Sequence, residues 1–138
     1  MAKPVKQRLI TAAMKARRES IAPYSKFKVG AALQTAQGEV ITGANVESAS
    51  YGLTCCAERV ALFTALTRGR RNFTAIAVVA RVNGGPMPCG ACRQLLAEYA
   101  PKADVWVADS RMPNRVRSFT VKELLPGAFL EVPRVGSE

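Results

Sequence analysis

The sequence predicts an α/β fold in which a mixed β-sheet lies between layers of helices, a three-layer α-β-α sandwich. Stretches with helical spacing of apolar residues alternate along the chain with stretches typical of strands, in the order α-β-β-α-β-α-β-β. One predicted strand, residues 73–80, is a continuous apolar run rich in Val, Ile and Ala, as expected of a central strand buried on both faces. The length of 138 residues and the apolar fraction of 49% fit one globular domain, residues 1–138.

The first half of the chain predicts one helix and two strands. The helix is expected over residues 5–20, where apolar residues recur at helical spacing between Lys and Arg. Residues 27–33 alternate in polarity and predict a half-buried strand. The turn residues at 36–38 lead to a returning strand at 40–43. A polar loop at 44–54 follows, and such a loop beside reactive residues is expected to contact substrate.

The second half predicts two further helices around the central strand. The first is expected over residues 56–66, with Gly69 placed to end it. The second is expected over residues 90–99, where Pro101 stops it. The remaining elements are a strand, a short strand and a helical turn at residues 105–108, 116–119 and 122–125.

The formal net charge of +10 allows two interpretations. It can attract nucleic acid by neutralising phosphates, or it can keep a small-molecule enzyme soluble. The Lys and Arg residues are scattered, and no aromatic residues interleave with them to build a stacking platform. We therefore favour the solubility interpretation and expect no nucleic-acid partner.

The composition also restricts the compartment and the chemistry. The N-terminal residues lack the apolar stretch of a signal peptide, and the longest strongly apolar run, residues 75–80, is too short to cross a bilayer. We expect a cytoplasmic protein with no membrane partner, whose four cysteines serve metal or redox chemistry rather than disulfides. The absence of histidine excludes Ser-His-Asp and Cys-His nucleophiles and any imidazole metal ligand.

Three cysteines and a glutamate have the spacing of a catalytic metal site. Cys56 stands two residues before Glu58, and Cys89 and Cys92 form a Cys-x-x-Cys pair at the predicted start of a helix. The pattern matches that of the zinc deaminases, with Cys56 where histidine also occurs. Helix N-termini favour bound thiolate, and we expect Arg59 to donate hydrogen bonds to sulfur from outside the ligand set. The predicted cofactor is one Zn²⁺ per chain.

Glu58 is expected to move protons at this site. A carboxylate near an open metal position can take a proton from water and pass it on. A general acid and base must alternate between charged and neutral forms, and a dry pocket helps by raising the pKa of the carboxyl. Taken alone, Glu58 would be an ordinary helix glutamate.

Two other interpretations of the cysteines explain less. A closed Cys₄ zinc site without catalysis would need Cys55 as a ligand, but adjacent residues point about 100° apart on a helix. Cys55 is instead expected to be a small buried hydrophobe. A redox pair at Cys89 and Cys92 leaves Cys56 and Glu58 without a role.

The chain resembles the cytidine deaminases, in particular their short-chain class that assembles as tetramers, from Tyr24 to Phe129. Several separate motifs occur in the order typical of that family, which makes the resemblance specific. They are YSKFKVGAA at 24–32, NVE at 45–47, ASY at 49–51, CAER at 56–59, PCGACRQ at 88–94 and LLPGAF at 124–129. The resemblance implies a cytidine deaminase-like fold. It also implies hydrolysis of cytidine or deoxycytidine to the uracil nucleoside and ammonia, a step of pyrimidine salvage.

The resemblance also implies substrate contacts within one chain. Asn45 and Glu47 would hydrogen-bond the ribose hydroxyls, Phe27 would pack against the nucleoside, and the backbone of Ala57 would contact the base. It assigns the three cysteines above to zinc and the glutamate to proton transfer. For two of the contacts a structural role is the alternative, because Phe27 alternates with core positions and Asn45 suits a turn.

Other contacts are implied between chains. Ala49, Tyr51 and Phe129 would reach the site from neighbouring subunits, with Phe129 stacking on the pyrimidine. Each active site would then be complete only in a homotetramer.

Two departures from the family pattern affect the expected substrate rather than the reaction. Ser48 stands where asparagine is usual, and Val60 stands where threonine is common. One alternative is a related deaminase of another aminated ring such as blasticidin S. A second, suggested by the net charge of +10, is a deaminase of cytosine within RNA or DNA. The non-enzyme alternative is a zinc-stabilised binding module.

Overall fold

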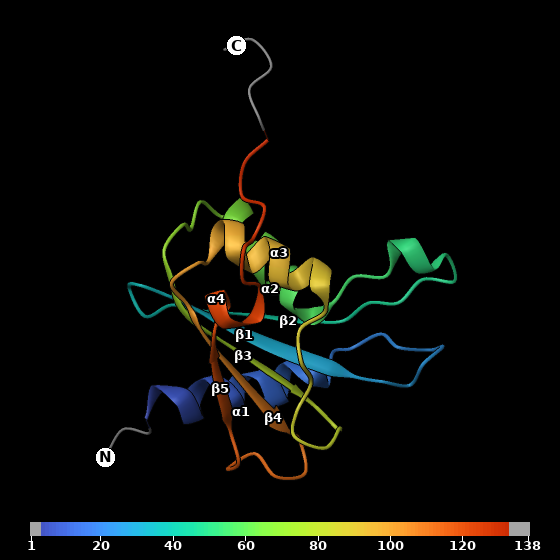
Figure 1. Ribbon diagram of the computed structural model, residues 1–138. Helices are drawn as coiled ribbons and strands as arrows, with labels where there is room; N and C mark the ends of the chain where they lie inside the picture. Colours follow the sequence, from blue (N-terminus) through green and yellow to red (C-terminus); the bar gives the residue numbers. More distant parts are fainter. Residues whose placement is uncertain (1–3, 133–138) are drawn as a thin grey trace.

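A mixed five-stranded sheet forms the centre of the protein in the computed structural model, which describes residues 4–132 (Figure 1). The strand order is β2-β1-β3-β4-β5. Strands β3 and β4 run parallel, and the other neighbouring pairs are antiparallel. In chain order the strands are Val29–Thr35 (β1), Val40–Ala44 (β2), Phe73–Ala80 (β3), Asp104–Asp109 (β4) and Arg117–Thr120 (β5).

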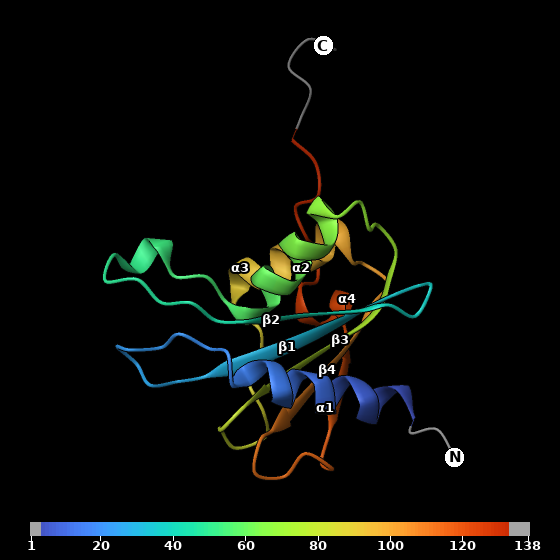
Figure 2. The same cartoon turned by 180° about the vertical axis from the view of Figure 1, so that it is seen from behind.

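Helices cover both faces of this sheet. Helix α1 (Val5–Arg17) lies on one face, and α2 (Ala57–Thr67), α3 (Gly90–Tyr99) and the short α4 (Val121–Leu124) lie on the other (Figures 1 and 2). The predicted three-layer α-β-α sandwich is therefore confirmed. Between β2 and α2 the chain makes a long excursion, residues 45–55, which we call the arm. It contains the 3₁₀ turn Tyr51–Leu53 and projects sideways from the layers.

Two hydrophobic clusters hold the layers together. The cluster under α1 contains Leu9, Ile10 and Trp106, and the cluster on the other face includes Leu62 of α2. The ammonium of Lys6 lies 5.5 Å from the centroid of the Trp106 ring. Burial of one such Leu or Ile side chain contributes roughly 1.5–3 kcal/mol, so both clusters support the sheet substantially.

Strand β1 differs from the sequence prediction. The half-buried strand expected at residues 27–33 is wrong in two respects: the strand is Val29–Thr35, and all seven of its residues are buried. Gly30 and Ala32 face α1 instead of solvent, and the residues between them face α2, because these two helices cover opposite faces of the strand. Phe27 precedes the strand and is 41% exposed, so the core role considered for it is also wrong.

Two glycines let the helices approach the sheet closely. A Cβ added to Gly30 would lie 2.0 Å from the Ala13 carbonyl oxygen of α1. A Cβ added to Gly43 would lie 2.5 Å from the Ala61 nitrogen of α2. Both contacts are shorter than any side chain tolerates, so these glycines set the distance of each helix from the sheet and thereby place the start of α2.

Helix α1 ends at Arg17, three residues before the predicted end. The chain leaves the helix because Ile21 pairs with the arm, where its nitrogen donates to the Asn45 carbonyl at 2.9 Å. The later elements match their predictions to within a residue or two. Within residues 4–132 no helix combines the length and apolar character needed to cross a membrane.

Candidate active site

Three sulfur atoms converge where two helices of the same layer begin. Cys56 is the N-cap of α2, Cys89 is the N-cap of α3, and Cys92 lies in the first turn of α3. Both N-cap residues have extended backbone conformations, which aim the helix starts at a common point. We call the three sulfur atoms the thiolate site.

The spacing of these sulfurs suits a tetrahedral metal ion. The Sγ atoms of Cys56 and Cys89 lie 3.7 Å apart, those of Cys89 and Cys92 lie 3.5 Å apart, and all three lie within 4.8 Å of one another. Zn–S bonds of about 2.3 Å in a tetrahedron separate sulfurs by about 3.8 Å. The donor set therefore fits zinc, with three protein ligands and a fourth position left over.

Arg59 and the helix start favour a thiolate at Cys56. Hydrogen bonding from the Cys92 thiol, followed by that from Arg59, lowers the pKa of the Cys56 thiol well below its usual range. The Arg59 Nη2 atom donates to the Cys56 sulfur at 3.4 Å and to the Thr54 carbonyl at 3.3 Å. Its Nε atom is buried without a hydrogen-bond partner among the described residues. The structure thus places Arg59 beside the sulfurs and outside the ligand set.

Cys55 does not join the thiolate site. Its backbone pairs with Val46 in the arm, and its side chain is partly buried rather than fully buried as expected. Burial raises the pKa of its thiol. The described residues therefore give three convergent sulfurs rather than the four of a closed zinc site.

Glu58 is a buried carboxyl next to these sulfurs. It is the second residue of α2 and is 6% exposed. Burial raises the pKa of its carboxyl to about 7. A carboxyl with this pKa exchanges protons readily near neutral pH, which is the property a general acid and base needs.

The arm and the turn before β1 hold the other candidate residues of one chain. The buried Asn45 amide ties these segments together: its Oδ1 accepts from the Val29 nitrogen and the Ser20 hydroxyl, and its Nδ2 donates to the Phe27 carbonyl at 2.8 Å. The structural role considered for Asn45 is therefore present. Ala57 is buried at the start of α2, directly after a sulfur-bearing residue.

Glu47 lies in the arm with its carboxylate held by the turn before β1. Its Oε1 accepts from the backbone nitrogens of Tyr24 at 3.0 Å and Ser25 at 3.1 Å, and its Oε2 accepts from the Ser25 hydroxyl. These bonds, the Ser25 hydroxyl first, lower the pKa of the Glu47 carboxyl. Lys26 adopts a left-handed conformation, with φ of 61°, where the turn reverses. A pocket of about 230 Å³ lies beside Glu47 and Tyr51.

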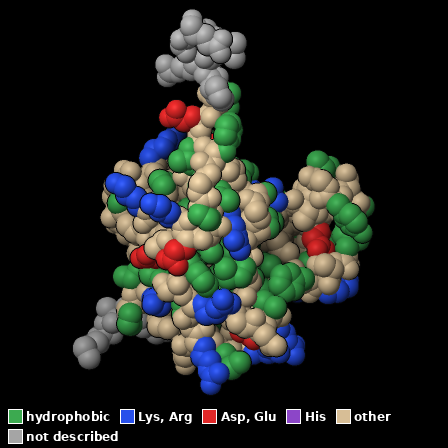
Figure 3. Space-filling view, in the orientation of Figure 1, with side chains coloured by type: hydrophobic (Ala, Val, Ile, Leu, Met, Phe, Trp, Pro, Cys, Tyr) green, Lys and Arg blue, Asp and Glu red, His purple; other side chains and the backbone are tan. Residues whose placement is uncertain are grey.

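The three residues expected to serve neighbouring chains are exposed. Ala49 and Tyr51 lie near the tip of the arm, with Tyr51 82% exposed. Phe129 is 64% exposed and follows α4, and its carbonyl accepts from the Gln94 side chain at 2.6 Å. Figure 3 shows hydrophobic side chains gathered on the projecting arm.

Sequence reasoning assigned no role to several groups that support the site. The Tyr24 and Ser25 nitrogens orient Glu47, and the Thr54 carbonyl orients Arg59. These are backbone groups, so no residue type signals them. Arg93 and Gln94 stand in a motif of the sequence, but each also donates to a backbone carbonyl more than thirty residues away.

A buried carboxyl beside three convergent thiols at helix N-termini, on a three-layer α-β-α fold, defines a zinc-dependent hydrolase of the deaminase type. Residues 3–108 match the family described as the cytidine and deoxycytidylate deaminase zinc-binding region. The match spans most of the chain and includes all three converging cysteines. The chain belongs to this family and is a zinc-dependent enzyme.

Individual relatives agree with this assignment. A cytidine deaminase of Halalkalibacterium halodurans is 54% identical over 124 residues, which cover 90% of this chain and 93% of that protein. The crystal structure of a cytidine deaminase from Burkholderia pseudomallei superposes with a TM-score of 0.84 at 52% identity and covers 88% of this chain and 97% of that one. A blasticidin-S deaminase of Bacillus cereus is 32% identical and covers 74% of this chain and 76% of that protein.

Proposed function

We propose that this chain, as one deaminase domain, hydrolyses cytidine and deoxycytidine to uridine and deoxyuridine and releases ammonia, as in pyrimidine salvage. The observation that carries the proposal is the buried Glu58 carboxyl, with a pKa of about 7, beside three convergent sulfurs. The identity to cytidine deaminases over nine-tenths of the chain supports this substrate above other aminated rings. Four free thiols among the described residues are consistent with a cytoplasmic location.

Cys56, Cys89 and Cys92 are the proposed zinc ligands. A zinc ion held there would supply an activated water near neutral pH, since coordination to zinc lowers the pKa of water. Three thiolates together with Zn²⁺ would carry a net negative charge. The guanidinium of Arg59 offsets part of this charge through its hydrogen bond to the Cys56 sulfur.

Glu58 is the proposed proton carrier of the reaction. It accepts a proton from the attacking water and donates to N3 of the pyrimidine, so that C4 becomes open to attack. It then takes a second proton from the hydroxyl group that has been added to C4 and passes it to the amino group. The bond between C4 and this nitrogen breaks, ammonia leaves, and C4 becomes the carbonyl of uracil. Its burial supports this cycle, because a carboxyl with a pKa of about 7 gains and loses a proton at little cost near neutrality.

Glu47 and Asn45 are the proposed contacts to the ribose. In Glu47, Oε1 already accepts two hydrogen bonds and Oε2 accepts one, which leaves Oε2 able to accept another from a hydroxyl. In Asn45 the amide nitrogen uses one hydrogen for the Phe27 carbonyl and has a second to donate. Phe27 itself is partly exposed on the same turn and can pack against the nucleoside, and the backbone of Ala57 is the proposed contact to the base.

Ala49, Tyr51 and Phe129 are proposed to complete sites of neighbouring chains in a homotetramer. Their exposure on projecting segments supports this role, since large exposed apolar side chains that gather on one segment mark interaction sites. Leu53 at the tip of the arm is also 74% exposed.

The test is a spectrophotometric assay of purified protein with cytidine, deoxycytidine, blasticidin S and a cytosine-containing RNA, together with a zinc count per chain. We expect turnover of both nucleosides, one zinc per chain, and no salt-sensitive binding to RNA. Faster turnover of blasticidin S, or turnover of RNA alone, would replace the proposed substrate. Full zinc occupancy without any deamination would indicate a binding module.

A further inference from the structure

Arg93 joins two backbone carbonyls that belong to distant parts of the chain. Its Nε donates at 2.8 Å to the carbonyl of Pro88, the residue before Cys89. Its Nη1 donates at 3.0 Å to the carbonyl of Leu124, the last residue of α4. We call residues 124–130 the C-terminal segment. One guanidinium therefore bridges the turn that leads into Cys89 and Cys92 and the first residue of this segment.

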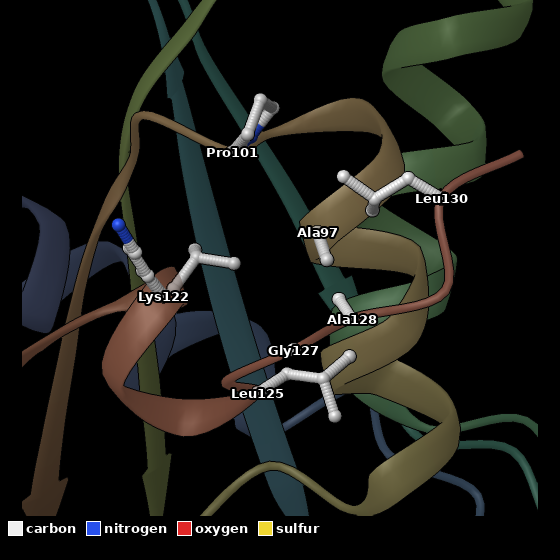
Figure 4. A pocket seen from close by; sticks show the side chains of 8 residues that line it. Ala97, Pro101, Lys122, Leu125, Gly127, Ala128 and Leu130 are labelled. Carbon is white, nitrogen blue, oxygen red and sulfur yellow. The ribbon is translucent and has the colours of Figure 1, made fainter.

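Polar links join the C-terminal segment to α3 in addition to the apolar contacts of Leu124, Leu125 and Ala128 with the core. Gln94, next to Arg93, donates from its side chain to the Phe129 carbonyl at 2.6 Å. Figure 4 shows the segment passing alongside α3, with a pocket of about 260 Å³ between them. Ala97, Leu125 and Leu130 line this space. The bonds from Arg93 and Gln94 therefore tie the segment to α3 on either side of a gap in the apolar contact.

The position of the Pro88 carbonyl depends on the thiolate site. Pro88 is fully buried and precedes Cys89, whose sulfur lies 3.5 Å from that of Cys92 on the following turn of α3. A metal ion bound by both sulfurs would join the turn at Cys89 directly to the first turn of α3. Arg93 spans the same junction.

We propose that Arg93 is a positioning residue that couples zinc binding at the thiolate site to the ordering of the C-terminal segment. The proposal rests on the three proposed zinc ligands and is independent of which nucleoside is the substrate. Coupling of this kind is reciprocal: zinc stabilises the attached segment, and the attached segment retains zinc. Since Phe129 belongs to the segment, zinc binding adds to the bond from Gln94 that holds Phe129 in place.

Two measurements test the coupling. The first is hydrogen–deuterium exchange of peptides covering residues 124–130, with and without zinc. The second is the rate of zinc release to a coloured chelator. In the unaltered protein, zinc removal should raise exchange in the segment about tenfold. In Arg93→Met, exchange should be high whether or not zinc is bound, and zinc should leave roughly ten- to a hundredfold faster, as for residues that orient metal ligands.

Three further variants separate the coupling from general loosening. Gln94→Ala should raise exchange of the segment while retaining its dependence on zinc, because the Arg93 bridge remains. Arg93→Lys, for use if the Met variant does not fold, keeps the charge but cannot span both carbonyls, so it should also lose the dependence on zinc. Arg115→Met removes the same charge from an exposed loop and should match the unaltered protein in both measurements.

Zinc release from both Arg93 variants at the unaltered rate would overturn the coupling, as would segment exchange in the unaltered protein that does not respond to zinc. Neither measurement uses a nucleoside. A failure of the coupling is therefore distinct from a failure of the proposed substrate.

Discussion

The thiolate site and the arm adjoin each other in the chain but are supported in opposite ways. The sulfurs and Glu58 stand at the starts of helices that pack on the sheet, with Glu58 and Cys92 buried, Cys56 partly buried and Cys89 exposed. The arm leaves the layers and is held through backbone pairing of Ile21, Val46 and Cys55, with its tip in solvent. The first region is fixed by the core of its own chain, whereas the second presents side chains outward.

The difference indicates how the work of the enzyme is divided. Proton transfer and metal binding need positions fixed to within about half an ångström, which packed elements provide. Recognition of a nucleoside needs surfaces that close around it, and in the proposed homotetramer the exposed arm would gain those surfaces by contact with another chain. One chain thus holds the reacting groups, and the assembly is proposed to complete the pocket.

The largest predicted effect lies at the buried region. Glu58→Gln keeps the size of the side chain but removes its proton-transfer capacity, so turnover of cytidine should fall about 10²–10⁴-fold with zinc content unchanged. Kinetic assays and a metal count on the same preparation check this. Turnover close to that of the unaltered protein would remove Glu58 from the mechanism.

The second effect concerns the stability of the metal-free protein. Glu58 has an ordinary pKa of 4.5 when unfolded and about 7 when folded, so the folded state favours the neutral form. Its contribution is fully present below pH 4.5 and is lost as the pH rises through 7. The free energy of unfolding should therefore decrease by about 3 kcal/mol between pH 4.5 and pH 8, relative to Glu58→Gln under the same conditions. Urea titrations of both proteins at a series of pH values measure this decrease. If the free energy of unfolding depends on pH equally in both proteins, the assignment to Glu58 is contradicted.

The third effect falls on the base of the arm. Glu47→Gln weakens charge-assisted bonds to hydroxyl groups, so KM for cytidine should rise about tenfold while zinc binding stays the same. The lowered pKa of Glu47 means that its stabilising bonds are present above pH 4.5 and are lost as the pH falls below that value. The turn at residues 23–28 should therefore loosen in acid, and exchange of its amides reports this. An unchanged KM would exclude the ribose contact.

The smallest effect on stability is predicted at the tip of the arm. Tyr51→Ala should change the free energy of unfolding by less than about 0.5 kcal/mol, because the side chain is exposed, yet activity should drop. Mixing this variant with Glu58→Gln chains should restore activity in about a quarter of the sites if subunits assort randomly. No recovery after exchange of subunits would mean that Tyr51 serves its own chain.

Most helices and strands could be predicted from the sequence, because the apolar residues that they bury recur at regular helix or strand spacing. It failed for β1, where Gly30 and Ala32 alternate with larger residues and imitate a solvent-facing side. Small residues carry little hydrophobic signal, and their burial depends on a helix that approaches from elsewhere in the chain. The sequence therefore did not predict that α1 packs closely on Gly30 and α2 on Gly43.

The candidate site was predictable where chemistry restricts residue type. Two cysteines three residues apart, Cys89 and Cys92, have few other uses when the chain also carries Glu58 two residues after a third cysteine. The supporting bonds were not predictable, because Arg93 and Gln94 act on carbonyls brought close only by the fold.

Trp106, the single tryptophan of the chain, lies beneath α1 on the face of the sheet opposite the sulfurs. Its indole fluorescence therefore reports the docking of the first helix and gives little direct information about metal loading. Emission from Trp106 and absorbance in the ultraviolet from a thiolate complex, for example with Co²⁺ in place of zinc, monitor the two faces separately. Recording both signals during one thermal unfolding experiment shows whether the two faces of the sheet unfold at the same temperature.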